Sequence, residues 1–289
     1  MNLPDFLYLA PEDPAELASL LARHGERAKI LAGGTDLIIA LKERTQVPKV
    51  VIDISGLKDL AGIEPLDGGW IRLGALTTFE EMEGSRLLQE KYPALVQAAS
   101  AVGSPQVRAM GTVGGNSCNG SPAADSPPAL MAYGAEVNLV SAQGRRTMNL
   151  GDFITHNRET AIRPEEYLES FSLPEPEPAS AGEYIYAGLR EAMEIDLVNA
   201  AVYLSLDQGK VAKARIVLGA VAPRPIRAPK AEEMLSGQEP SPGLIEQAAD
   251  QAAQESSPIN DFRASAGYRR YTTALLVKKA LNRVASKLA

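Results

Sequence analysis

Cysteine and histidine are scarce in this chain. Its 289 residues include one cysteine, Cys118, and two histidines, His24 and His156. A single cysteine cannot form an internal disulfide, a CxxC metal site or a protein-ligated iron–sulfur cluster. Two histidines are too few for a self-contained histidine-rich metal site. Any redox or metal chemistry must therefore use a bound organic cofactor or another chain, and no metal ligands are assigned.

Long apolar runs and an excess of positive charge are also missing. The longest apolar stretches, such as 37–41 and 137–140, are far shorter than the ~20 residues of a membrane-spanning helix. The N-terminal sequence MNLPDFLYLAPEDP lacks the basic start and apolar run of a secretory signal, which predicts a cytoplasmic protein. With 29 Lys and Arg against 36 Asp and Glu, the net charge is −7, so a nucleic-acid groove is not expected.

The composition is that of a folded globular protein, with 45% hydrophobic and 22% charged residues. The length fits about two domains. In the first, Asp13, Pro14 and Gly25 predict the start and end of a helix. An apolar strand at 29–32, a glycine turn, a helix at 37–41 and a strand at 50–54 then predict a small α/β unit over residues 1–57, too small to stand alone.

The remaining residues predict a larger second unit and a separate C-terminal domain. In the second unit, 58–176, we expect strands at 71–75 and 167–173, a helix at 78–101, a long irregular segment at 103–128 and a hairpin at 136–149. The proline-rich run 174–178 marks a boundary. Strands at 200–206 and 213–220 and helices at 245–253 and 265–288 predict an α+β domain at 180–289, with Arg269 and Arg270 on a solvated helix face.

Two glycine clusters are the strongest chemical signals. The first, Gly33-Gly34-Thr35-Asp36, stands between a strand and a helix, where glycine lets backbone N–H groups approach a phosphate. A plain tight turn is the alternative, because the Gly-x-Gly-x-x-Gly spacing of a dinucleotide-binding unit is absent. The second cluster, 111–116, lies in the irregular segment and could serve only turns. Two clusters about eighty residues apart favour one extended ligand held between two subdomains.

These motifs together resemble a known family. The segments 31–37, 111–116 and 121–126, with Ser104-Pro105-Gln106-Val107-Arg108 and 190–195, resemble the FAD-binding medium subunit of the molybdenum hydroxylases, and most closely the bacterial xanthine dehydrogenase branch. The resemblance covers essentially the whole chain. It implies an α+β fold: a two-subdomain FAD-binding domain of the vanillyl-alcohol-oxidase (PCMH) type at 1–176, then a smaller domain of the CO-dehydrogenase flavoprotein type at 180–289, with a three-stranded sheet and helices.

The resemblance also implies where FAD binds. The turn at 30–37 would hold the pyrophosphate, and the second cluster would add contacts, with Asn119 and Asp125 near the ribityl and phosphate region. Val102 would lie near the adenine, and Leu168 against the isoalloxazine. The residues assigned to FAD in this way are Lys29, Ile30, Leu31, Ala32, Gly33, Gly34, Thr35, Asp36, Leu37, Val102, Gly111, Thr112, Val113, Gly114, Gly115, Asn116, Asn119, Asp125, Leu168 and Tyr186.

One position departs from the family pattern. Many relatives carry a lysine in the strand facing the flavin, near Tyr186 of this chain. A tyrosine can stack or donate a hydrogen bond but brings no positive charge, so the flavin potential or the electron acceptor could differ. An amphipathic strand tyrosine with a buried ring is an equal alternative. The single cysteine also excludes the extra iron–sulfur cluster of the 4-hydroxybenzoyl-CoA reductase flavin subunit.

The function implied by the resemblance is electron transfer within a molybdenum hydroxylase complex. A large molybdopterin-binding subunit would oxidise a purine or related N-heterocycle, and a small subunit with two [2Fe–2S] clusters would carry electrons to the FAD here. NAD⁺ or another acceptor would receive them, in a dimer of heterotrimers. No catalytic acid or base is then needed in this chain. The alternatives are a self-sufficient FAD-dependent oxidoreductase of the same fold and a flavin-free binding protein whose glycines serve only turns.

Overall fold

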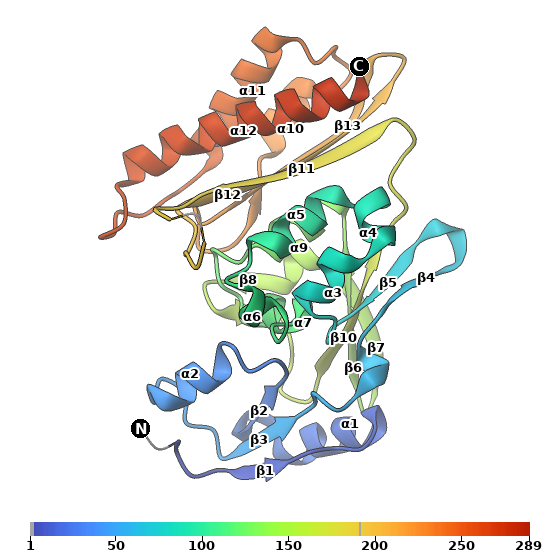
Figure 1. The fold of residues 1–289 in the computed structure, drawn as a ribbon, viewed down its shortest axis with the longest axis vertical. Helices are drawn as coiled ribbons and strands as arrows, with labels where there is room; N and C mark the ends of the chain where they lie inside the picture. Colours follow the sequence, from blue (N-terminus) through green and yellow to red (C-terminus); the bar gives the residue numbers. More distant parts are fainter. Residues whose placement is uncertain (1–2, 191) are drawn as a thin grey trace.

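The three larger β-sheets follow one another along the long axis of the molecule (Figure 1). The structure is a computed structural model that describes residues 3–190 and 192–289. In this part of the chain, no helix is long and apolar enough to cross a membrane. The N-terminal sheet, the central sheet and the C-terminal sheet occur in chain order, so each unit is built from a largely continuous stretch of sequence.

The N-terminal unit is a parallel sheet of order β1-β3-β2 with a helix on it. Asp13 Oδ1 accepts from the Glu16 N–H at 2.8 Å, and Gly25 ends the helix, as the sequence predicts. Leu17 and Leu21 of this helix share a core with Tyr167 from the central sheet, so the small unit is completed by the rest of the chain. Its elements are β1 Leu7–Leu9, α1 Pro14–His24, the 3₁₀ turn Gly25–Arg27, β2 Ala28–Leu31, α2 Leu37–Lys42 and β3 Val50–Asp53.

The central sheet has the order β4-β5-β10-β6-β7, and its middle strand comes last in the sequence. The predicted hairpin and the strand at 167–173 are confirmed. The sheet consists of β4 Ile63–Pro65, β5 Ile71–Gly74, β6 Glu136–Ser141, β7 Gly144–Asn149 and β10 Tyr167–Leu173. Two further 3₁₀ turns, Lys58–Leu60 and Asp67–Gly69, and the small hairpin β8 Ile154–His156 and β9 Glu159–Thr160 accompany it.

The helix predicted at 78–101 is three helices: α3 Phe79–Gly84, α4 Arg86–Lys91 and α5 Pro93–Ala101. Ser85 divides the first two because its Oγ accepts from the Leu88 N–H at 3.3 Å and so starts a new helix. Pro93 starts the third, since proline has no N–H to continue the preceding helix. The three helices pack over the central sheet and leave Leu88, Tyr92 and Leu95 fully buried.

The segment 103–128 is not irregular, and the sequence prediction was wrong here. It contains the short helices α6 Pro105–Arg108 and α7 Val113–Cys118, and α8 Ser126–Tyr133 begins near its end; α9 Leu150–Phe153 follows β7. Side-chain caps define these helices: Ser104 Oγ accepts from the Val107 N–H at 3.3 Å, and Thr112 Oγ1 from the Gly115 N–H at 3.1 Å. Helices this short carry no visible apolar periodicity, which is why the pattern failed to show them.

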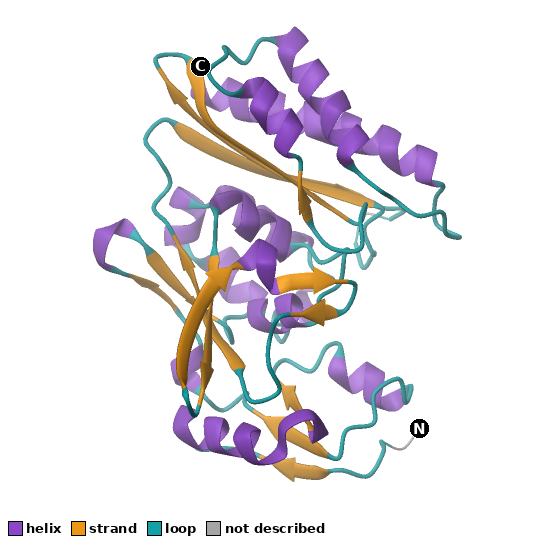
Figure 2. Cartoon of the chain, turned by 180° about the vertical axis from the view of Figure 1, so that it is seen from behind, coloured by secondary structure: helices purple, strands orange, loops and turns teal. Residues whose placement is uncertain are grey.

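The C-terminal unit is an antiparallel sheet with helices on its outer face (Figure 2). The expected three strands are present as β11 Ser180–Ala187, β12 Val198–Asp207 and β13 Lys210–Gly219, and the two-residue β14 Ile226–Arg227 adds a fourth. The helices are α10 Pro229–Leu235, α11 Pro242–Glu255 and α12 Ala266–Leu288. The inner face packs on the central unit, where the rings of Tyr133 and Tyr203 lie 5.6 Å apart.

Arg269 corrects a second expectation. It is 1% exposed rather than solvated. Its Nη1 donates to the Leu197 carbonyl at 2.5 Å, and its Nη2 donates to both carboxylate oxygens of Asp261 at 2.9 Å. The guanidinium therefore ties α12 to the start of β12 and to the loop before the helix.

Candidate FAD-binding site

The first glycine cluster forms a turn between β2 and α2. Gly34 has a φ of +73°, which a residue with a side chain adopts only under strain. Within the described residues, the backbone N–H groups of Gly33, Gly34, Thr35 and Asp36 donate to no protein acceptor. Successive unpaired N–H groups in a turn of this kind attract an anion. The turn is half-buried up to Thr35 and open at Asp36, so a ligand can reach it.

The second glycine cluster is in direct backbone contact with the first. A Cβ atom added to Gly33 would lie 1.8 Å from the Met110 carbonyl oxygen and 3.1 Å from the Gly111 Cα. Only a glycine permits this approach, because real Cβ contacts are essentially never below 3.0 Å. Two clusters about eighty residues apart in the sequence therefore lie side by side at one place on the protein.

The N–H groups at the start of α7 are already used within the protein. The Val113 N–H donates to the Thr77 carbonyl at 3.0 Å, and the Gly114 N–H to the Ala75 carbonyl at 2.9 Å. A Cβ on Gly114 would lie 2.6 Å from the Ala75 Cβ, so this glycine packs α7 against the chain after β5. Gly115 is exposed. The second cluster thus supplies close packing and a small exposed surface, whereas the first supplies unpaired donors.

Asn116 of the second cluster and the two polar side chains assigned near the ribityl chain all have protein partners. Asn116 Oδ1 accepts from Ser126 Oγ at 2.7 Å, which joins α7 to α8. Asn119 Oδ1 accepts from Arg158 Nη1 at 2.5 Å. Asp125 Oδ1 accepts from the Tyr184 hydroxyl at 2.8 Å. These partners fix Asn116 within α7 and fix Asn119 and Asp125 in the segment between α7 and α8.

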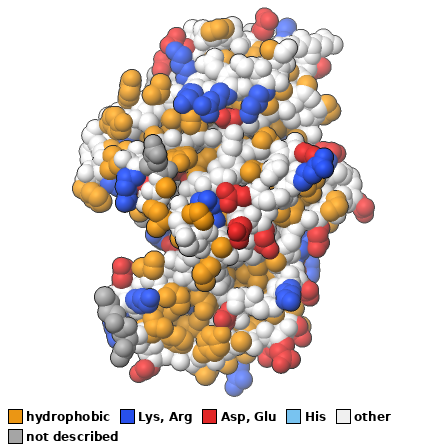
Figure 3. Space-filling model, viewed as in Figure 1, with side chains coloured by type: hydrophobic (Ala, Val, Ile, Leu, Met, Phe, Trp, Pro, Cys, Tyr) orange, Lys and Arg blue, Asp and Glu red, His pale blue; other side chains and the backbone are white. Residues whose placement is uncertain are grey.

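The three residues assigned to the ring systems have different environments. Val102 and Leu168 are 8% and 5% exposed and belong to the core of the central unit. Tyr186 is 37% exposed, so the alternative of a strand tyrosine with a buried ring is wrong. It lines a hollow between α5, β11 and α12 together with Lys279 and Arg283. Figure 3 shows Lys and Arg side chains gathered over α12, so positive charge lies near Tyr186 although the tyrosine brings none.

Sequence reasoning missed the residues that hold Asp125. The Tyr184 hydroxyl lies 3.2 Å from Asp196 Oδ2, and Asn199 Nδ2 donates to the same oxygen at 2.8 Å. Asp196 is 4% exposed. Burial and the nearby Asp125 carboxylate raise the pKa of Asp196 to about 8, and burial raises the pKa of Asp125 to about 6. An acid directly before the apolar run that starts at Leu197 was the signal that the sequence offered.

Cys118 packs against the central core. Desolvation raises the pKa of its thiol to about 12, so the nucleophilic thiolate is scarce at neutral pH. Over residues 3–190 and 192–289, no three His, Cys, Asp or Glu side chains come together as a metal site.

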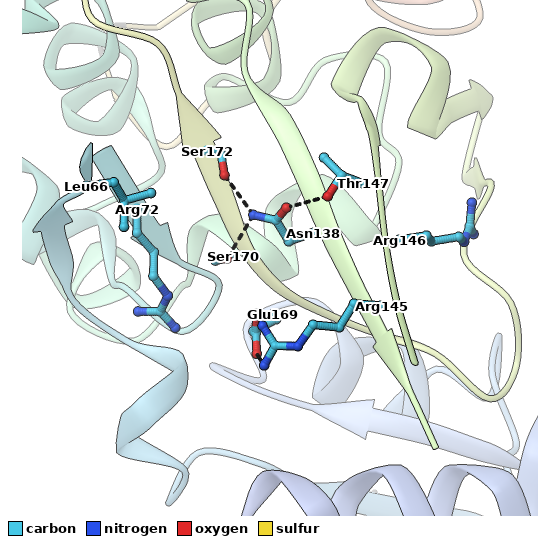
Figure 4. A pocket seen from close by; sticks show the side chains of 9 residues that line it. All are labelled: Leu66, Arg72, Asn138, Arg145, Arg146, Thr147, Glu169, Ser170 and Ser172. Carbon is cyan, nitrogen blue, oxygen red and sulfur yellow. Dashed lines mark hydrogen bonds and ion pairs between the residues drawn. The ribbon is translucent and has the colours of Figure 1, made fainter. Parts of the chain in front are cut away.

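A second hollow lies on the open face of the central sheet, away from these residues (Figure 4). Its charges are internally paired, since Arg145 Nη2 donates to Glu169 Oε1 at 2.8 Å. Its amide is paired too: Asn138 Nδ2 donates to Ser172 Oγ at 2.9 Å, and its Oδ1 accepts from Thr147 Oγ1 at 2.9 Å. This hollow contains none of the residues assigned to FAD.

Comparison with known protein families identifies the cofactor. Residues 4–176 match the family described as the FAD binding domain in molybdopterin dehydrogenase, and residues 184–284 match the CO dehydrogenase flavoprotein C-terminal domain. The chain belongs to this family of FAD-binding subunits. It is accordingly an FAD-dependent oxidoreductase subunit, and a half-buried turn with unpaired N–H groups fits the pyrophosphate of FAD.

Relatives of this FAD-binding subunit span its whole length. It is 32% identical to the putative xanthine dehydrogenase FAD-binding subunit of Escherichia coli K12 over 271 residues, covering 93% of this chain and 92% of the relative. It is also 32% identical to the carbon monoxide dehydrogenase medium chain of Afipia carboxidovorans over 283 residues, with 98% and 97% covered. The solved carbon monoxide dehydrogenase from Hydrogenophaga pseudoflava, 31% identical, superposes with a TM-score of 0.96 over 100% of both chains.

Proposed function

We propose that this chain is the electron-transfer subunit of a cytoplasmic, xanthine dehydrogenase-like complex. A large molybdopterin subunit would oxidise the substrate, and a small subunit with [2Fe–2S] clusters would pass the electrons to the FAD of this chain. NAD⁺ or another acceptor would take them up. The observation that carries the proposal is the contact between the two glycine clusters beside a turn with unpaired N–H groups.

The residues of this chain bind and orient the cofactor. The N–H groups of 33–36 would donate to the pyrophosphate, and β2 residues 29–31 would place that turn. The residues from Gly111 to Asn116 would form the adjoining wall, with Asn119 and Asp125 accepting hydrogen bonds from ribityl hydroxyls. Val102 would pack near the adenine, and Leu168 and Tyr186 near the isoalloxazine. Bound FAD supplies the redox chemistry, which this set of residues does not provide by itself.

The lack of an acid–base dyad favours the subunit over a self-sufficient oxidoreductase. Of the two carboxyls in the described site, Asp196 is buried, and Asp125 and Asp196 both accept hydrogen bonds within the protein, from Tyr184 and Asn199. A protein that only relays electrons needs no such dyad. We therefore expect isolated protein to reduce dyes at most, and substrate turnover to require partner chains.

The decisive experiment is native purification of the chain from its source cells. Co-elution with a large molybdenum-containing chain and a small iron–sulfur chain, with FAD present, would support the proposal. An FAD protein that elutes alone and turns over a substrate would favour the self-sufficient oxidoreductase. A colourless protein, even after incubation with FAD, would reject FAD binding by this site.

Substrate, acceptor and stoichiometry are tested on the purified complex. We propose a purine or related N-heterocycle as substrate, because residues 115–120 and 190–193 resemble the xanthine dehydrogenase branch of the family. Turnover of hypoxanthine but not of carbon monoxide or aldehydes would support this choice. Absorbance of NADH formed from NAD⁺ tests the acceptor, and light scattering tests the proposed dimer of heterotrimers.

A further inference from the structure

Two carboxyl groups meet where the loop before α8 touches the C-terminal sheet. Asp125 comes from that loop, and Asp196 lies two residues before the start of β12. The Tyr184 hydroxyl, from β11, lies 2.8 Å from Asp125 Oδ1 and 3.2 Å from Asp196 Oδ2. A phenol has one proton and can donate to one carboxylate at a time. If both carboxyls were ionised, one would lose this donor.

No cation compensates the pair. Across the described residues, no Lys or Arg donates a hydrogen bond to either carboxyl. The packed elements contribute Tyr184 from β11, Asn199 from β12 and Arg269 from α12. Arg269 contacts the neighbouring Leu197 carbonyl, but its charge is paired with Asp261. Two adjacent carboxylates without a cation are strongly disfavoured when buried, so the pair retains one proton near neutral pH.

The proton belongs mainly to Asp196. Asp196 is 4% exposed whereas Asp125 is only partly buried, and burial together with the Asp125 carboxylate raises the pKa of Asp196. Tyr184 stays protonated near neutral pH, because burial and the two carboxylates raise its pKa well above 10. Near pH 7, Asp125 is therefore ionised and accepts a hydrogen bond from the neutral Tyr184 hydroxyl, while Asp196 is neutral.

The pair adjoins the second glycine cluster. Ser126, the residue after Asp125, donates to Asn116 Oδ1 at 2.7 Å, so the carboxyl of Asp125 comes from the chain segment attached to α7. Asp125 is also only partly buried, unlike Asp196, so part of it remains open to a ligand.

We propose that Asp196 is a positioning residue for FAD: by holding the proton of the pair, it keeps Asp125 ionised and fixed as the acceptor for a hydroxyl group of the cofactor. This inference rests on the proposed FAD site. Asp196 itself need not touch FAD. It acts through Asp125, and its effect is a pH dependence of FAD binding.

We expect FAD affinity to fall on both sides of neutral pH, along an acid limb and an alkaline limb of the pH profile. As the pH falls, Asp125 gains a proton and ceases to be a charged acceptor, so FAD affinity falls. As the pH rises, Asp196 loses its proton, and repulsion between the two carboxylates displaces Asp125, so affinity falls again. We expect the dissociation constant to be lowest near pH 7 and to rise about tenfold by pH 5 and by pH 9.5, since a hydrogen bond to a charged group is worth roughly that factor.

The test is FAD titration of the full-length apoprotein from pH 5 to 9.5, followed by flavin fluorescence. Asp196→Asn keeps the size of the side chain and can still donate to Asp125, but it cannot ionise. It should retain the acid limb and lose the alkaline limb. The control is Asp207→Asn, the same substitution at the exposed last residue of β12, which should keep both limbs.

The outcomes separate this inference from the proposed function. Wild-type protein that binds FAD with a flat pH profile, or Asp196→Asn that keeps the alkaline limb, would overturn the role of Asp196 while leaving the FAD site intact. A wild-type chain that binds no FAD at any pH would refute the proposed site and this inference together. Circular dichroism of both variants at pH 7 and 9.5 establishes that the binding changes do not come from unfolding.

Discussion

The contact between Gly33 and Met110 predicts that a single methyl group at Gly33 disrupts FAD binding. In Gly33→Ala the new Cβ would start 1.8 Å from the Met110 carbonyl oxygen. To reach the 3.0 Å below which real Cβ contacts are essentially absent, the two backbone segments must separate by about 1.2 Å, the difference between the two distances. Both partners are backbone, so no side chain can rotate away to relieve the clash.

The free-energy cost of this clash in Gly33→Ala should appear mainly as a loss of FAD affinity. Overpacking costs about 1–3 kcal/mol, and the first cluster can move outward because it is only half-buried. Moving outward takes the unpaired N–H groups of 33–36 away from the second cluster. If the whole cost falls on the FAD-bound state, the dissociation constant rises roughly 5- to 150-fold.

Fluorescence titration with FAD and thermal unfolding of the apoprotein together measure this effect. Gly84→Ala is the matched control, because Gly84 ends α3 and an added Cβ would meet nothing within 4 Å. We expect Gly84→Ala to bind FAD as wild type does. Wild-type affinity in Gly33→Ala would refute the argument that the contact between the two clusters forms the site.

Three further predictions concern the side chains of Arg269, Asp196 and Cys118. Arg269→Met should lower the free energy of unfolding by about 1–3 kcal/mol in urea titration, since it leaves the buried Leu197 carbonyl without this donor and leaves Asp261 with Arg263 as its cationic partner. An unchanged free energy of unfolding would contradict this. The raised pKa of Asp196 means that the folded protein binds more protons than the unfolded one between about pH 4 and 8. Its contribution to stability is thus complete below about pH 4 and is lost as the pH rises through about 8, so Asp196→Asn should flatten this part of the stability profile, measured by urea unfolding from pH 5 to 9. Cys118 should react with a thiol reagent at pH 8 only after denaturation, because the pKa of the native thiol is about 12; rapid labelling of native protein would show that it is accessible.

The sequence predicted the elements with strong local signals. Asp13, Pro14 and Gly25 define α1 through groups within one helix, and the structure has the same cap and end. The strand at 167–173 was visible from its composition and has the same bounds in the structure. The family resemblance, supported by the matches over 4–176 and 184–284, identified the cofactor.

The sequence predictions failed where the structure depends on contacts between residues that are distant in the sequence. The sequence predicts Arg269 on a solvated helix face, and only the folded chain shows that Leu197 and Asp261 accept its hydrogen bonds. Asp196 lies 71 positions after Asp125, so no local pattern could pair them. The short helices between 105 and 118 depend on side-chain caps and on Gly114 packing against Ala75, which periodicity does not record.

The strand order of the central sheet has a consequence for synthesis. During translation the hairpins of β4 with β5 and of β6 with β7 emerge first, and each has an edge that awaits β10. Until residue 173 has left the ribosome, both edges lack their native partner and can pair with another chain. Ribosome stalling before β10 should therefore produce aggregation-prone nascent chains, whereas stalling after it should leave the sheet closed and the two glycine clusters free to meet.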